Sequence, residues 1–161
     1  MNERQMKFKT NFGFIYICAT SEFVTKVSWQ KVSVKMASDK REKKLIEMAS
    51  TQIYEYLDGR RKQFDLPLSY QGTSFQEEVW SNLLKIPYGQ TQSYTELAVQ
   101  IERPLAVRAV GTANGQNPLC LIIPCHRVIA KSGQLSGYIG GEKIKEKLLE
   151  LEKMMMSGFR K

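Results

Sequence analysis

The sequence predicts an α/β fold in two domains. Residues 1–70 are expected to form a small N-terminal sheet-plus-helix domain, and residues 71–161 a mainly helical C-terminal domain with a helix-turn-helix. Apolar side chains alternate with polar ones in the first forty residues, as in half-buried strands, and recur at helical spacing after residue 73. With 161 residues, 42% of them apolar, the chain is long and apolar enough for a packed core.

The N-terminal domain is expected to contain strands followed by one helix. Alternation over 12–18 and again over 27–34 predicts two strands. Ser38 or Asp39 can cap a helix that follows over 40–57, because both side chains accept a hydrogen bond from the first helical turn. Apolar residues recur every three or four positions along that stretch, so one face of the helix should pack on the sheet.

The C-terminal domain is expected to be built from short helices. Apolar spacing predicts helices over 75–84, 91–101, 105–114 and 142–152. The second and third of these are joined by a tight turn and followed by an arginine, which fits a helix-turn-helix. Between the third and the last helix, the apolar run 119–123 predicts a buried strand, and Pro124 must end its ladder.

The net charge and the cysteine content limit the classes of protein to which the chain can belong. The net charge is +8 and the pI about 9.4, which suits a nucleic-acid partner but equally suits a solvated surface, since the charge is spread over both halves. No run of 18 apolar residues occurs, so no membrane span is predicted. Three cysteines without a C-x-x-C spacing argue against a disulfide scaffold and favour the reducing cytoplasm.

The residues that can carry chemistry are concentrated after Pro124. Cys125 is followed by His126, which is the one histidine of the chain, and by Arg127. A thiol beside potential cations loses its proton more easily and becomes a nucleophile. In an extended segment adjacent side chains point apart, so proton transfer from thiol to imidazole would need a bridging water, with an acid behind the ring. The last helix offers the candidates Glu146, Glu150 and Glu152, and position alone does not select one.

The segment from Pro124 to Val128 resembles the active-site signature of the O6-alkylguanine-DNA alkyltransferases, the methylated-DNA–protein-cysteine methyltransferases. Further segments are similar to that family in order and spacing: Phe75-Gln76 with Val79-Trp80, Ile86–Gly89, Thr91–Tyr94, Ala106–Gly111, Asn117-Pro118 and Gly137–Gly141. The resemblance covers residues 72–152, about half of the chain. The N-terminal part matches only in size and strand character.

The resemblance implies a role for each residue around the nucleophile. Cys125 would accept the alkyl group, and His126 would act as base through a water held with Glu152. Asn117 would be the hinge that ties the DNA-reading helix to the nucleophile segment. Arg127 would buttress the site near the second helix of the helix-turn-helix.

A second group of residues would handle the DNA. Tyr94 would press on the phosphate beside the target nucleotide, and Arg108 would fill the space left by the extruded base. Tyr138 would face the base and its leaving oxygen, and the backbone carbonyl of Val128 would read the amino edge. Ile139 stands where several relatives have a small polar residue, which would alter the polarity of the pocket.

The function implied is direct reversal of DNA alkylation. A methyl or alkyl group of O6-alkylguanine, and of O4-alkylthymine, in double-stranded DNA would pass irreversibly to Cys125, once per chain, in a monomer that needs no cofactor and no metal. A non-enzymatic alkyltransferase-like protein that binds damaged DNA is the first alternative, but such proteins replace the cysteine. A helix-turn-helix transcription factor and a cysteine hydrolase are the others, and the adjacent Cys–His pair counts against the hydrolase.

Overall fold

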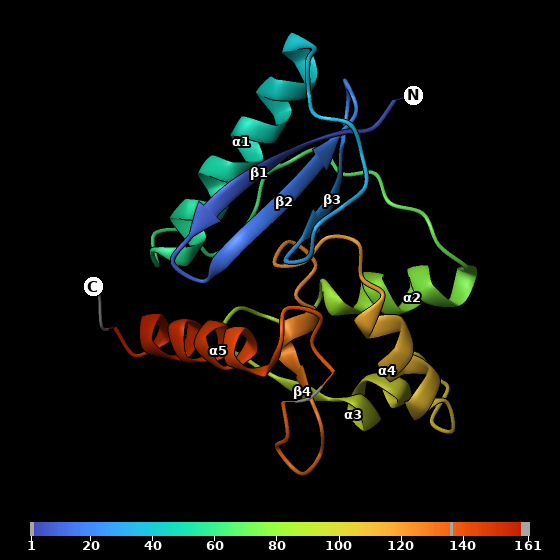
Figure 1. Cartoon of the computed structure of the whole chain (residues 1–161). Coiled ribbons are helices and arrows are strands. Elements are labelled where there is room, and N and C mark those ends of the chain that lie inside the picture. Colours follow the sequence, from blue (N-terminus) through green and yellow to red (C-terminus); the bar gives the residue numbers. More distant parts are fainter. Residues whose placement is uncertain (1, 136, 159–161) are drawn as a thin grey trace. The chain divides into compact units, whose positions relative to one another are not determined.

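The computed structural model describes residues 2–135 and 137–158, and its contacts divide the chain into two compact units (Figure 1). The first unit runs to Tyr70 and includes the later segment Pro118–Ile122. The second unit comprises Gln71–Asn117 and the chain from Ile123 onward. The chain therefore leaves the second unit after Asn117 and returns to it at Ile123.

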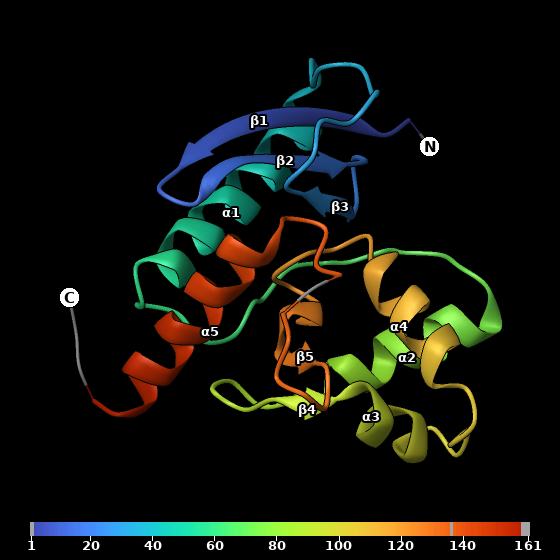
Figure 2. The same ribbon diagram turned by 60° about the horizontal axis from the view of Figure 1, so that its bottom comes forward.

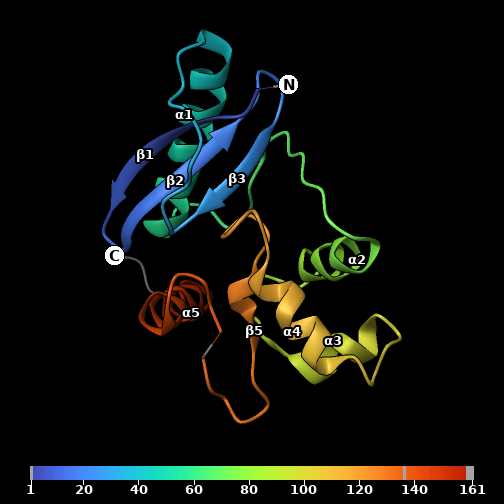
Figure 3. The same cartoon turned by 45° about the vertical axis from the view of Figure 1, so that its right-hand side comes forward.

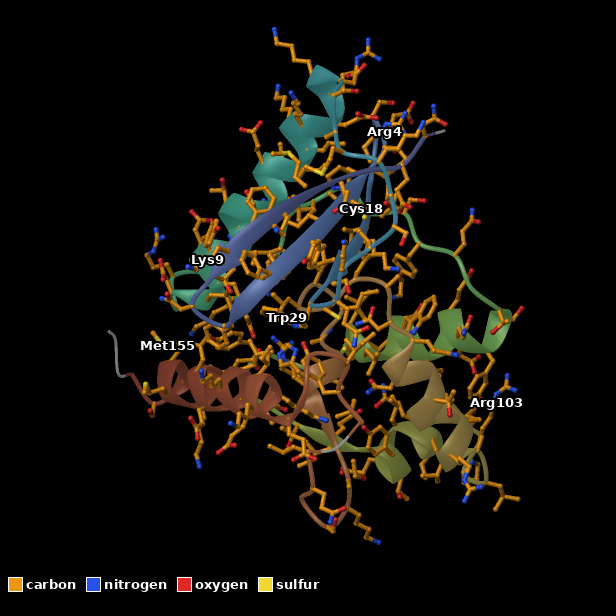
Figure 4. All side chains as sticks on the ribbon, in the orientation of Figure 1. Arg4, Lys9, Cys18, Trp29, Arg103 and Met155 are labelled. Carbon is orange, nitrogen blue, oxygen red and sulfur yellow. The ribbon has the colours of Figure 1, made fainter. Side chains whose placement is uncertain are left out.

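The first unit is a three-stranded antiparallel sheet with one helix on it. Its strands β1 (Arg4–Thr10), β2 (Gly13–Ala19) and β3 (Val24–Ser28) lie in the order β1-β2-β3, and α1 (Lys40–Leu57) runs along the sheet (Figure 1). The sheet begins with a tight hairpin, in which Thr10 is paired with Gly13. Cys18 lies on β2 and is fully buried (Figure 4). The alternation in the sequence thus correctly indicated a sheet with one buried face.

The helix α1 begins and ends where the sequence predicts. The Asp39 carboxylate accepts a hydrogen bond from the Arg41 backbone N–H at 2.8 Å, and the Glu42 carboxylate accepts one from the Asp39 N–H at 3.3 Å. This reciprocal pair satisfies two donors that would otherwise lack partners at the helix start. Of the two residues that could cap the helix, the structure selects Asp39. The apolar face is buried by Ile46, Ala49, Ile53, Tyr56 and Leu57.

Two predicted strands are wrong. The chain does not stay extended over 27–34, because β3 ends at Ser28, whose hydroxyl accepts from the Gln30 N–H at 3.0 Å and turns the backbone. The run 119–123 is buried but forms only one bridge, from Leu119 to Val27, and Leu121 has a φ of +73°. The apolar side chains correctly predicted that this run is buried, but a buried segment need not be hydrogen-bonded into a sheet.

The second unit contains the remaining helices (Figures 2 and 3). In chain order its elements are α2 (Ser74–Leu83), β4 (Gln92–Ser93), α3 (Tyr94–Gln100), α4 (Val107–Gly115), the 3₁₀ turn η1 (Cys125–Arg127), β5 (Val128–Ile129) and α5 (Glu142–Met156). The short strands β4 and β5 pair in parallel, so the residues just before α3 lie beside those just after η1 (Figure 2). No helix in the described part of the chain is both long and apolar enough to cross a membrane.

The helices of this unit are all present, with shifted ends. The helix predicted over 91–101 starts only at Tyr94, because Ser93 caps it and Gln92–Ser93 pairs with β5. The helix predicted from residue 105 starts at Val107, since its first turn is preceded by a separate turn through Pro104. The last helix extends beyond 152 to Met156.

We expect Asp39→Ala to lower the free energy of unfolding by about 1 kcal/mol, because it removes one half of the capping pair of α1. Urea denaturation followed by circular dichroism measures the change. Ser38→Ala is the matched control, since Ser38 is exposed and does not cap the helix. Equal losses in the two variants would contradict the assignment of the cap.

Candidate active site

The candidate nucleophile lies in a single 3₁₀ turn, not in an extended segment. The Arg127 N–H donates to the Pro124 carbonyl at 3.0 Å, and the Val128 N–H donates to the Cys125 carbonyl. The expectation that Cys125 and His126 lie in an extended segment is therefore wrong, because the chain turns immediately after Pro124. All three residues of the turn are buried, and His126 is 0% exposed.

A buried glutamate on α5 holds this turn. Glu152 accepts four hydrogen bonds: from His126 Nε2 at 2.8 Å, from Arg127 Nε at 2.9 Å and Nη2 at 3.0 Å, and from the backbone N–H of Gly89 at 3.0 Å. Both carboxylate oxygens are used, and the Arg127 pair is bidentate. Of the three acids that the sequence offered, the structure brings Glu152 to the imidazole and leaves Glu146 and Glu150 exposed.

Arg127 binds two segments besides the turn on which it lies. Besides Glu152, its Nη1 donates to the backbone carbonyl of Ile86 at 2.8 Å, and its guanidinium lies 5.5 Å from the centre of the Tyr88 ring. These partners belong to α5 and to the turn after α2, not to α4. A guanidinium can bind two groups on different elements at once, which explains why this position joins α5 to the turn 86–89.

The electrostatics of His126 and Glu152 favour a neutral imidazole paired with a negatively charged carboxylate. Burial alone would raise the pKa of Glu152, but the hydrogen bonds and charges of His126 and Arg127 outweigh it and lower that pKa to about 2. Burial lowers the pKa of His126, opposed by Glu152 and reinforced by the charges of Arg127 and Lys145. A neutral ring that donates from Nε2 to a carboxylate carries its basic lone pair on Nδ1.

Three backbone carbonyls around the nucleophile each accept a hydrogen bond from a buried side chain. Asn117 Nδ2 donates to Ile123 at 2.7 Å, Asn114 Nδ2 lies 3.4 Å from the Cys125 oxygen, and Lys145 Nζ donates to Val128 at 2.6 Å. Asn117 thus joins the two points at which the chain leaves and re-enters the second unit. The Val128 carbonyl, expected to face the base, is engaged by Lys145.

Sequence reasoning missed both Asn114 and Lys145. Lys145 is 0% exposed, and burial lowers its pKa, with an opposite effect from Cys125. The helical spacing places Lys145 on the same face of α5 as Leu148 and Glu152, and both of those residues are buried. A lysine on a buried helix face needs a hydrogen-bond acceptor, and this need could have indicated that Lys145 binds a group near the site.

Tyr94 is the first residue of α3 and lies beside the nucleophile turn. Its ring is in van der Waals range of Gly111, where an added Cβ would lie 3.7 Å away, and its hydroxyl would be 3.7 Å from a Cβ at Gly137. Burial raises the pKa of Tyr94, the neighbouring Cys125 raises it further, and the Asn114 amide lowers it. Tyr94, Asn114 and Cys125 therefore share one environment.

The other predicted DNA-handling residues are placed as follows. Tyr138 is buried and Ile139 half-buried, in the loop before α5. Arg108 is exposed as the second residue of α4 and, with the almost fully exposed Leu105, borders a groove between α2 and α4. Arg103, in the turn before α4, also projects to the surface (Figure 4). Arg108 thus stands apart from the buried cluster of Glu152.

No group of three cysteine, histidine or acidic side chains among residues 2–135 and 137–158 is arranged to hold a metal ion. Cys18, Cys120 and Cys125 are all in the thiol form.

Comparison with known proteins places this geometry in a family. Residues 74–154 match the family described as 6-O-methylguanine DNA methyltransferase, DNA binding domain. The chain belongs to the methylated-DNA–protein-cysteine methyltransferase family. The matched region contains every element from α2 to most of α5, and so the whole Glu152 cluster.

Individual methyltransferases are similar over different lengths. The inducible methylated-DNA–protein-cysteine methyltransferase of Bacillus subtilis is 52% identical over 112 residues, which are 70% of this chain but only 63% of that protein, less than two thirds of its length. A methyltransferase of Methanosarcina acetivorans is 42% identical over 90% of this chain and 95% of its own. The crystal structure of the Mycobacterium tuberculosis O6-methylguanine methyltransferase has a TM-score of 0.85 at 39% identity, covering 95% of this chain and 94% of that one.

We expect Glu152→Gln to destabilise the protein by on the order of 3 kcal/mol at pH 7, since a neutral amide leaves the buried Arg127 charge without its partner. Because the pKa of Glu152 is lowered, its contribution is fully present above about pH 4.5 and is lost as pH falls toward 2. The difference between wild type and variant should therefore shrink in acid. Urea denaturation at several pH values measures it.

Glu150→Gln serves as the control, because Glu150 is exposed on the same helix. A Glu152→Gln variant as stable as wild type at pH 7, or a difference that does not change with pH, would show that the carboxylate charge does not stabilise the turn.

Proposed function

We propose that this chain reverses DNA alkylation by transferring a methyl or alkyl group from O6-alkylguanine in duplex DNA to Cys125. The observation that carries the proposal is the buried turn of Cys125 and His126 held by Glu152, in a chain of the methyltransferase family. The relatives named above are methyltransferases, and the crystal structures similar to this chain include the Mycobacterium tuberculosis enzyme in complex with DNA, at a TM-score of 0.84.

The contrast with Cys18 supports Cys125 as the acceptor. Burial raises the pKa of Cys18 to about 12. The charge of Glu3 adds a smaller increase and that of Lys26 a decrease, so this thiol stays protonated at neutral pH. Cys125 instead adjoins a neutral imidazole whose Nε2 is bound to a carboxylate. We assign His126 the role of base: Nδ1 takes the thiol proton through a bridging water, while Glu152 orients the ring and stabilises its charged form.

The transfer itself is a displacement at carbon. The thiolate sulfur forms a bond to the alkyl carbon as the bond from that carbon to O6 breaks, and the electron pair leaves on the base oxygen. Tyr138 is assigned to face this oxygen and Ile139 to border it. A thioether is not a leaving group under these conditions, so each chain reacts once and needs no cofactor and no metal.

Access to the base requires its extrusion from the duplex. Arg108 is exposed at the start of α4, where a long side chain can enter the stack in place of the base, and small residues follow it on that helix. Tyr94 at the start of α3 is assigned to the adjacent phosphate, Val128 to the amino edge of the base, and Asn117 to the hinge between α4 and the nucleophile turn.

The alternatives are less well supported. A non-enzymatic damage binder has no use for the buried Cys125 and His126, and a transcription factor has no use for the Glu152 cluster. The partner we propose is double-stranded DNA that contains O6-alkylguanine, and O4-alkylthymine as a second substrate, bound by a monomer. The proposed compartment is the cytoplasm, since the acceptor must remain a thiol.

Incubation with a duplex that carries O6-methylguanine should add one methyl group per chain, on the peptide that contains Cys125. Intact-protein and peptide mass spectrometry measures this. Cys125→Ala should transfer none, and Cys120→Ala, the matched control, should transfer normally because Cys120 lies in the first unit. Repeated turnover, or methyl found on Cys18 or Cys120, would overturn the proposal.

Arg108→Ala should slow repair of duplex DNA at least tenfold more than it slows reaction with free O6-benzylguanine, because the free base needs no extrusion. Single-turnover rates on both substrates measure the difference. Arg103→Ala removes a charge of the same sign from the neighbouring turn, where Arg103 is paired with Glu78, and should change the ratio of the two rates much less than Arg108→Ala does. Equal losses for Arg108→Ala on both substrates would assign Arg108 to the fold.

A further inference from the structure

The amide of Asn114 is buried between the DNA-reading helix and the nucleophile turn. Asn114 lies on α4 and is 2% exposed, with Nδ2 3.4 Å from the Cys125 carbonyl oxygen. The same amide is close enough to Tyr94 to lower the pKa of its hydroxyl. The side chain therefore lies between Cys125, the proposed acceptor of the alkyl group, and Tyr94, which the proposed function assigns to the adjacent phosphate.

The carbonyl oxygen of this amide, Oδ1, is enclosed and accepts no hydrogen bond within the described part of the chain. A buried acceptor without a donor is costly, and proteins retain such groups where something else supplies the donor. The nearby Nδ2 already has Cys125 as a partner. Within the described residues the amide thus has a hydrogen-bond partner at Nδ2 and none at Oδ1.

The two substrate bases differ in what they can offer to an acceptor. Alkylation at O6 removes the proton from N1 of guanine, so the exocyclic amino group is the one N–H donor that the base retains. O4-alkylthymine has lost its N3 proton in the same way and has no amino group, so it carries no N–H donor at all. An acceptor in the pocket therefore distinguishes the two bases.

We propose that Asn114 is a specificity-determining residue, whose Oδ1 accepts a hydrogen bond from the exocyclic amino group of O6-alkylguanine. The amino group has two hydrogens, so the Val128 carbonyl and Asn114 can each accept one. This inference rests on the proposed function of Cys125. It implies that the protein prefers O6-alkylguanine to O4-alkylthymine because the thymine leaves a buried oxygen unpaired.

The test compares three duplexes that carry O6-methylguanine, O6-methylhypoxanthine or O4-methylthymine at one position. O6-methylhypoxanthine is the guanine analogue without the amino group. Wild type should react at least fivefold faster with O6-methylguanine than with the analogue. Asn114→Leu, which keeps the size of the side chain and removes the acceptor, should reduce that ratio about fivefold to tenfold and leave the rate on O4-methylthymine equal or higher.

Controls separate specificity from folding. Asn82→Leu replaces an amide on α2 that is bonded to Glu78 and Gln100, and it should leave the ratio as in wild type. Asn114→Met is a second apolar variant, whose flexible side chain fits an irregular space. Thermal melting and affinity for undamaged duplex show whether each variant is folded.

An unchanged ratio in a folded Asn114 variant, or an equal loss on all three duplexes, would overturn the proposal and leave Asn114 a purely structural residue. A wild-type ratio below fivefold also overturns the proposal, whether or not the variants fold. Failure of the proposed function is distinct, because wild type would then add no methyl to Cys125 from any duplex.

Discussion

The second unit depends on one buried carboxylate. Glu152, on α5, accepts four hydrogen bonds from two other segments: three from the turn of Cys125 and one from the turn after α2. A charge at 1% exposure is stable only when its hydrogen-bonding capacity is filled, and here the filling groups are also the residues next to Cys125. The requirement to satisfy this charge therefore fixes where the imidazole lies.

The backbone near Cys125 is fixed by the same need to satisfy buried polar groups. Here the acceptors are backbone carbonyls and the donors are side chains. The carbonyls of Ile123, Cys125 and Val128 each accept a hydrogen bond from a buried side chain of α4, of α5 or of the segment after α4. A turn held in this way is rigid without being part of a sheet. Asn114 lies near the end of α4 and Asn117 lies two residues after it, so two side-chain hydrogen bonds join this part of the chain to the segment of Cys125.

The sequence was informative where the physics is local. Asp39 caps α1 through a side chain two residues from the N–H that it binds, so this start was predicted from neighbouring residues, whereas the equally local cap at Ser93 was missed. The strand predicted over 119–123 failed because apolar content records burial and not pairing. The extended segment predicted for Cys125 and His126 failed because Pro124 was taken to end a strand that the chain never forms.

The sequence by itself determined which stretches are helical, that the first unit contains a sheet, and which residues are the candidate nucleophile and base, since each follows from short-range spacing and from side-chain chemistry. The resemblance to a family selected Glu152 among three acids. Only the tertiary structure decided that Arg127 joins this carboxylate and the turn at Ile86, that Lys145 is buried against Val128, and that Asn114 lies beside Cys125. These contacts join residues up to 41 positions apart, and a pairing at that distance depends on how the helices pack, which no local pattern records.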